Sequence, residues 1–124
     1  MNEALVMVLE DDPVITLGLE MELRHQGFDN LVLCNSVESA TSEISLRIPK
    51  VAIVDFTIDD SNSSVCIAQR LVQNACRVVF VADFEADVRN LPKTPRDCEV
   101  IEKPFRDAEV VEKISLLLRS PETN

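Results

Sequence analysis

The residues best suited to chemistry are charged side chains that directly follow short apolar runs. Glu10 and Asp11 follow one such run, Asp55 follows another, and Lys103 follows a third, weaker one. Clustered carboxylates repel one another, so they either acquire raised pKa values or hold a cation. Carboxylate and carbonyl oxygens, together with water, are the ligands that suit Mg²⁺. A lysine beside such a cluster adds the positive charge that an anionic phosphoryl group needs, so the pattern indicates metal-assisted phosphoryl transfer.

The apolar runs alternate with amphipathic stretches along the chain. Continuous apolar runs are typical of strands covered on both faces, and they predict strands over residues 4–9, 31–34, 51–54, 78–82 and, more weakly, 100–101. Apolar residues at helical spacing predict helices over residues 13–26, 37–47, 65–74 and 107–119. The segment 83–91 has a thin apolar pattern and two prolines soon after it, which predicts a short or mobile fourth helix.

This alternation predicts an α/β fold with a doubly wound parallel sheet, because right-handed crossovers place helices on both faces. Ligands bind beyond the carboxyl ends of the strands in such folds, so the acids and the lysine are expected at one edge. Asp12, ahead of a proline, is predicted to be only a helix cap. Residues 1–119 are assigned to a single domain, and residues 120–124 to a polar, frayed tail.

The composition narrows the range of partners and locations. The chain of 124 residues has a net charge of −10, which disfavours binding to nucleic acid or to an anionic membrane. No apolar run is long enough to cross a bilayer and no signal peptide is evident, so we expect a cytoplasmic protein. The four cysteines form no C-x-x-C pair, and each sits in or beside an apolar segment, so buried free thiols are expected.

Three motifs carry a family resemblance that covers nearly the whole chain. They are VLEDDP at residues 8–13, VAIVDF at residues 51–56 and EKPF at residues 102–105. Together they resemble the receiver domain of bacterial two-component response regulators, the family of the chemotaxis regulator. This resemblance implies a flavodoxin-like (βα)5 fold with strand order 2-1-3-4-5. It also implies a signalling protein, not an enzyme, that assists its own phosphorylation and dephosphorylation.

The resemblance implies a role for each candidate site residue. Asp55 matches the residue that accepts a phosphoryl group from a phosphohistidine of a sensor histidine kinase or a histidine phosphotransfer protein. Glu10, Asp11 and Asp55 match the residues that bind Mg²⁺, together with the backbone carbonyl of Thr57. Lys103 matches the lysine that pairs with the phosphoryl group, and the bond to the following proline is implied to be cis.

Two positions depart from the family pattern. The family has Thr or Ser at the end of the fourth strand and an aromatic residue three positions before the lysine, whereas this chain has Ala82 and Val100. We therefore expect atypical switching. The run FVADF resembles, in degenerate form, the Phe-Ala-Thr-Gly-Tyr motif of one subgroup of stand-alone receivers. In this run, Asp83 adds negative charge near the site, and Phe84 is a candidate shield of the acyl phosphate against water. The loop 58–61, after the third predicted strand, lacks the usual Pro and Gly and is expected to be mobile.

The predicted function is that of a single-domain response regulator in a phosphorelay, with an unknown downstream protein as output. One alternative is a receiver excised from a hybrid kinase. Another is a pseudo-receiver that binds proteins without phosphorylation. Ala82 and Asp83 favour this alternative, whereas the intact Glu10, Asp11, Asp55 and Lys103 disfavour it. A haloacid-dehalogenase-type phosphatase is disfavoured because Thr57 stands where that family has a second Asp. A flavodoxin-like flavin binder is disfavoured because no loop rich in Gly, Ser and Thr follows the first strand.

Overall fold

The computed structural model describes residues 3–119, so the tail predicted at residues 120–124 lies outside the described residues. Its strands, in chain order, are β1 (Val6–Leu9), β2 (Leu31–Cys34), β3 (Val51–Asp55), β4 (Arg77–Ala82) and β5 (Glu99–Glu102). The helices that alternate with them are α1 (Pro13–His25), α2 (Val37–Leu46), α3 (Ser61–Gln73), α4 (Glu85–Arg89) and α5 (Asp107–Arg119).

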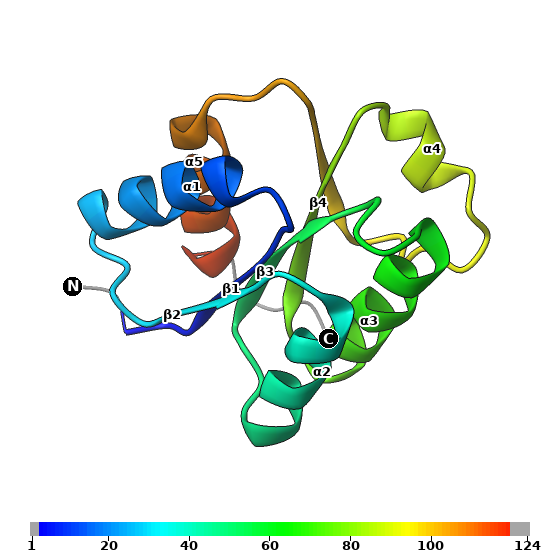
Figure 1. The fold of residues 1–124 in the computed structure, drawn as a ribbon, viewed down its shortest axis with the longest axis horizontal. Coiled ribbons are helices and arrows are strands. Elements are labelled where there is room, and N and C mark those ends of the chain that lie inside the picture. Colours follow the sequence, from blue (N-terminus) through cyan, green and yellow to red (C-terminus); the bar gives the residue numbers. More distant parts are fainter. Residues whose placement is uncertain (1–2, 120–124) are drawn as a thin grey trace.

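The strands form one parallel sheet in the order β2-β1-β3-β4-β5. Helices α1 and α5 lie together on one face, and α2 and α3 lie on the other (Figure 1). The predicted flavodoxin-like α/β architecture is therefore confirmed, including the strand order and the short fourth helix, which has five residues. Between residues 3 and 119, no helix combines the length and the apolar character needed to cross a membrane.

Side chains of a single strand alternate between two apolar layers. In β3, Val51 and Ile53 pack in the layer of α1 and α5, whereas Ala52 and Val54 pack in the layer of α2 and α3. All residues of β1 and β3 are buried, which is why these strands are continuous apolar runs in the sequence. Because the strands are parallel, the charged groups that follow them gather at one edge of the sheet, where the carboxyl ends of the strands lie.

Capping side chains fix where the helices begin. Asp12 caps α1 as predicted, because its Oδ1 accepts the backbone N–H of Val14 at 2.9 Å. The predicted start of α3 at residue 65 was wrong. The helix begins earlier, at Ser61, because the Asp60 carboxylate accepts the Ser63 N–H at 2.7 Å and so stabilises a polar first turn.

The cysteines differ in exposure. Cys34, Cys76 and Cys98 are buried free thiols, as predicted, and burial raises the pKa of Cys76 to about 12. A thiol with such a pKa stays protonated and unreactive at neutral pH. The prediction was wrong for Cys66, which is exposed. Helix α3 turns Val65 and Ile67 into the core and leaves the residue between them at the surface.

Candidate functional site

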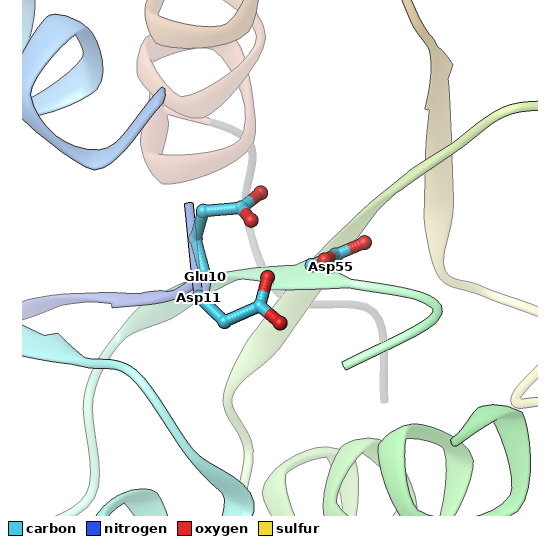
Figure 2. A group of neighbouring side chains, drawn as sticks. All are labelled: Glu10, Asp11 and Asp55. Atoms are coloured by element: carbon cyan, nitrogen blue, oxygen red, sulfur yellow. The ribbon is translucent and has the colours of Figure 1, made fainter. Parts of the chain in front are cut away.

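Three carboxylates meet at the carboxyl edge of the sheet. Glu10 and Asp11 follow β1, and Asp55 is the last residue of the adjacent strand β3. One oxygen of each side chain lies within 4.8 Å of the others. Figure 2 shows the carboxylates of Glu10 and Asp11 directed toward Asp55. The structure therefore brings together the three acids that the sequence placed at strand ends.

Glu10 is buried, with 3% of its surface exposed. Its Oε2 accepts the backbone N–H of Asp12 at 3.0 Å, whereas its Oε1 is buried without a hydrogen-bond partner among the described residues. Burial raises the pKa of Glu10 from 4.5 to about 7. The Asp12 N–H lowers this pKa in part, the charge of Asp55 raises it, and Lys103 lowers it again. The charge of Lys103 therefore compensates only in part for the burial of the ionised form of Glu10.

Asp55 is also buried, and its Oδ1 receives three donors. The backbone N–H and the hydroxyl of Thr57 each lie 3.3 Å from this oxygen, and Lys103 Nζ lies 3.4 Å from it. The same ammonium lies 4.0 Å from Glu10 Oε1. Sequence reasoning gave Thr57 a role through its backbone carbonyl only and missed its hydroxyl, although a hydroxyl two residues after an aspartate is a common local donor.

Lys103 is held at this edge through its backbone. Its N–H donates to the carbonyl of Ala82 at 2.8 Å, which extends the pairing of β4 and β5 by one bond. The Lys103–Pro104 peptide bond is cis, as the resemblance implied. The lysine side chain is 25% exposed, so its charge is partly screened by solvent.

The donor set fits Mg²⁺. The three acids offer oxygen ligands, which this ion prefers, and Asp11 is exposed and able to share the ion with water. A cation would also give the buried Glu10 Oε1 the partner that it lacks and would relieve the repulsion that raises the pKa of Glu10. The contribution of the Thr57 carbonyl stays a prediction.

The two departures from the family pattern lie on β4 and β5, the two strands that follow β3 in the sheet. Ala82 ends β4, is 2% exposed and contributes a methyl group at the position where the family has the hydroxyl of Thr or Ser. Val100 lies on β5, opposite Phe80 of β4, and is half-buried. Asp83 and Phe84 follow Ala82 and are exposed, so Asp83 adds its charge at the surface of the site.

The loop after β3 is anchored by its acids. Asp59 has a φ of 58°, and its Oδ2 accepts the backbone N–H of Val37, the first residue of α2, at 3.2 Å. Asp60 caps α3. Ser64 donates its hydroxyl to the carbonyl of Phe56 at 2.6 Å and ties the helix back to the loop. The acids of the loop are therefore engaged with helix N-termini, which the expectation of a mobile loop did not foresee.

Comparisons with known proteins agree with this architecture. No protein-family model matches the chain. The chain is 26% identical over 118 residues to the DNA-binding response regulator MtrA of Mycolicibacterium smegmatis, a match that covers 94% of this chain and 51% of MtrA. The chain thus spans about half the length of this curated relative.

Solved structures share the fold at lower identity. The receiver domain of the Erythrobacter litoralis response regulator PhyR is 22% identical, with a TM-score of 0.81 over 100% of this chain and 98% of that one. The BeF3-activated receiver domain of DrrB is 15% identical, with a TM-score of 0.80 over 96% of this chain and 100% of that one.

The fold is that of a response-regulator receiver domain, and the resemblance predicted from the three motifs is confirmed. The chain is similar to MtrA in sequence and to the PhyR and DrrB receiver domains in structure. The likeness to the Phe-Ala-Thr-Gly-Tyr subgroup stays a prediction.

Proposed function

We propose that the chain acts as a receiver in a two-component phosphorelay and accepts a phosphoryl group on Asp55 with the help of Mg²⁺. The observation that carries this proposal is the approach of three acidic side chains to within 4.8 Å of one another, beside a lysine 3.4 Å from Asp55. Such a constellation holds a cation and an anion next to each other, which is the electrostatic requirement of phosphoryl transfer.

Asp55 is the acceptor. One of its oxygens attacks the phosphorus of a phosphohistidine, so that an O–P bond forms, the P–N bond breaks and the imidazole nitrogen keeps the electron pair. Lys103 supplies positive charge beside the new acyl phosphate. Glu10, Asp11, Asp55 and the backbone carbonyl of Thr57 would hold Mg²⁺, which when bound supplies charge that offsets the phosphoryl oxygens. Hydrolysis is a separate step, in which water attacks the phosphorus, the O–P bond to Asp55 breaks, and inorganic phosphate and the free carboxylate are released. We therefore assign the protein the role of a signalling switch and not of an enzyme.

The donor is a sensor histidine kinase or a histidine phosphotransfer protein, and α1 is a suitable place for it to dock. This helix begins directly after the acid pair and exposes Val14, Leu17 and Met21, which are 77%, 55% and 63% exposed. Their spacing of three and four residues places them along one side of the helix, which we call the α1 stripe. An apolar stripe beside an acceptor suits a helix of a partner protein.

Mass measurement after incubation with an acyl-phosphate donor tests the proposal. The native protein should gain one phosphoryl group in Mg²⁺ and none in a chelator. Asp55→Asn should gain none, whereas Asp83→Asn, which keeps the three acids of the site, should gain one. A phosphoryl group in the Asp55→Asn variant, or none in the native protein, would contradict the assignment of Asp55.

A pseudo-receiver that binds proteins without phosphorylation is the second candidate, and the side chains of Ala82 and Val100 favour it, since neither carries a hydroxyl or an aromatic ring. Binding of beryllofluoride, a phosphoryl mimic, together with Mg²⁺ separates the two functions. The proposed location is the cytoplasm, and the proposed output is contact with a further protein.

A further inference from the structure

Oδ1 of Asp55 is the meeting point of donors from two directions. Lys103 reaches it from the end of β5, and Thr57 reaches it from the loop after β3 with both its backbone N–H and its hydroxyl. The hydroxyl is a neutral donor that is able to rotate, whereas the N–H is fixed by the backbone. The contact of this hydroxyl with Asp55 is separate from the metal-binding role proposed for the backbone carbonyl of Thr57.

The end of β4 offers no such donor. Ala82 comes directly after Val81, the register partner of Asp55, and its side chain is a buried methyl group. The next two side chains, of Asp83 and Phe84, are a carboxylate and a phenyl ring, and neither donates a hydrogen bond to an anion at neutral pH. A phosphoryl group on Asp55 would therefore find no hydroxyl on this strand.

We propose that the Thr57 hydroxyl donates a hydrogen bond to an oxygen of the phosphoryl group on Asp55 and so supplies the donor that β4 lacks. This inference rests on the proposed function of Asp55 as acceptor. The hydroxyl already lies 3.3 Å from the carboxylate, and a phosphoryl group bonded there extends oxygens into the same neighbourhood. A phosphoryl group is more highly charged than a carboxylate and offers three acceptor oxygens, so the bond strengthens on phosphorylation.

The surroundings of Thr57 leave room for its hydroxyl to change its hydrogen-bond acceptor from the Asp55 carboxylate to a phosphoryl oxygen. Its side chain is exposed and lines a cavity of about 270 Å³, together with Phe56, Asp83 and Asp87. The hydroxyl therefore turns from the carboxylate to a phosphoryl oxygen without displacing a core side chain. The negative charges of the two aspartates at the cavity repel a phosphoryl group. A neutral hydrogen-bond donor on this side of the site therefore helps to offset that repulsion.

A purely local turn would also bring Thr57 against Asp55. Aspartates commonly accept the N–H of the residue two positions later, and the backbone of Thr57 makes that bond here at 3.3 Å. The turn does not need the hydroxyl. Thr57→Val keeps the shape of the side chain, the N–H and the backbone carbonyl and removes only the hydroxyl, so this variant separates the two explanations.

The test is a titration of the native protein and its variants with beryllofluoride at saturating Mg²⁺, followed by amide NMR shifts. Thr57→Val should bind the mimic about tenfold more weakly, because a hydrogen bond to a charged acceptor is lost. Thr57→Ser should bind like the native protein. The double variant Thr57→Val with Ala82→Thr should recover affinity, because it restores a hydroxyl from β4. Thr41→Val, on the exposed side of α2, is the matched control and should change nothing.

Mg²⁺ alone is titrated in parallel, and its affinity should be the same in the native protein and in Thr57→Val. Equal affinity of these two proteins for beryllofluoride would overturn the inference and leave Asp55 as acceptor. Equal losses of Mg²⁺ and beryllofluoride affinity would overturn it too, because they would place the effect at the metal. A native protein that neither binds beryllofluoride nor gains a phosphoryl group would overturn the proposed function and this inference together.

Discussion

Oε2 of Glu102 accepts the backbone N–H of Glu85 at 2.8 Å, so the last residue of β5 caps the first turn of α4. The N-cap position of this helix is held by Phe84, which makes no side-chain capping bond. A carboxylate from a neighbouring strand thus satisfies a donor that a local polar residue satisfies in most helices. Because Lys103 follows Glu102 directly, the short helix is tied to the strand that leads into the candidate site.

Replacing Glu102 with Ala is expected to loosen α4. Loss of a cap destabilises a helix by about 1 kcal/mol, so α4 should open roughly five times more often in the variant than in the native protein. Hydrogen exchange of the amides of residues 85–89 measures this opening. Glu102→Gln keeps an accepting oxygen and is the matched control, for which exchange should stay near the native rate. If both variants exchange at the native rate, other contacts hold the helix.

The stability of the metal-free protein should fall as the pH rises toward 7. The pKa of Glu10 is about 7 in the folded protein and near 4.5 in an unfolded chain, so the folded state binds this proton more tightly. Below about pH 4.5 both states hold the proton and Glu10 carries no penalty. Between about pH 4.5 and 7 the free energy of unfolding falls by up to about 3 kcal/mol, and the loss is complete above this range.

Urea unfolding in a chelator at several pH values measures this effect, and Glu10→Gln is the control that removes the titrating group. The native curve should show the larger decrease with pH. Mg²⁺ should stabilise the native protein more at pH 7.5 than at pH 5, because the metal binds the ionised carboxylate. Identical pH dependence in the two proteins would show that burial of Glu10 does not shift its pKa in solution.

Charges placed in the α1 stripe should separate phosphorylation from docking. Met21→Glu is expected to keep phosphorylation by a small acyl-phosphate donor, because the residue is 63% exposed and lies outside both the acid cluster and the cavity that Glu10 and Asp11 line. Transfer from the cognate kinase or phosphotransfer protein should fall at least tenfold, since an apolar contact is replaced by a charge. Leu46→Glu, at a position that is 80% exposed on α2, is the control. Equal transfer to both variants would exclude the α1 stripe as the docking surface.

The ring of Phe84 should lengthen the lifetime of the acyl phosphate. It is 64% exposed and comes two residues after the end of β4. We expect the ring to fold over the phosphorylated acceptor and limit the access of water. Phe84→Ala should therefore lose its phosphoryl group faster than the native protein, as followed by mass over time. Leu116→Ala removes an exposed apolar side chain on α5 and should not change the half-life. A native half-life no longer than that of Phe84→Ala would rule out shielding.

The convergence of Glu10, Asp11 and Asp55 was predictable because parallel strands place their carboxyl ends at one edge of the sheet. Continuous apolar runs located β1 and β3 well for the same reason, since both faces of these strands are covered. The sequence did not reveal that Glu10 is buried with an unpartnered oxygen, because burial depends on the helices that pack around the edge.

The features that the sequence predicted wrongly or did not predict depend on how helices and strands are placed relative to one another in three dimensions. The start of α3 was misplaced because residues 61–64 are polar and show no apolar helical pattern, whereas the bond from the Ser63 N–H to Asp60 stabilises them as the first turn. The cap of α4 by Glu102 was not foreseen, since 17 positions separate the two bonded residues in the sequence. Cys66 was assigned to the core from apolar neighbours, although the phase of the helix turns it outward.

All four charged residues of the candidate site lie at the carboxyl edge of the sheet, and this leaves the opposite edge available for engineering. The turn between α3 and β4 lies at that opposite edge, and Asn74 and Ala75 are exposed there. A dye or an immobilisation tag attached to this turn would keep the entrance to Asp55 open to large proteins. The polarity of a parallel sheet thus makes this domain suitable for surface-based sensors of its own partners.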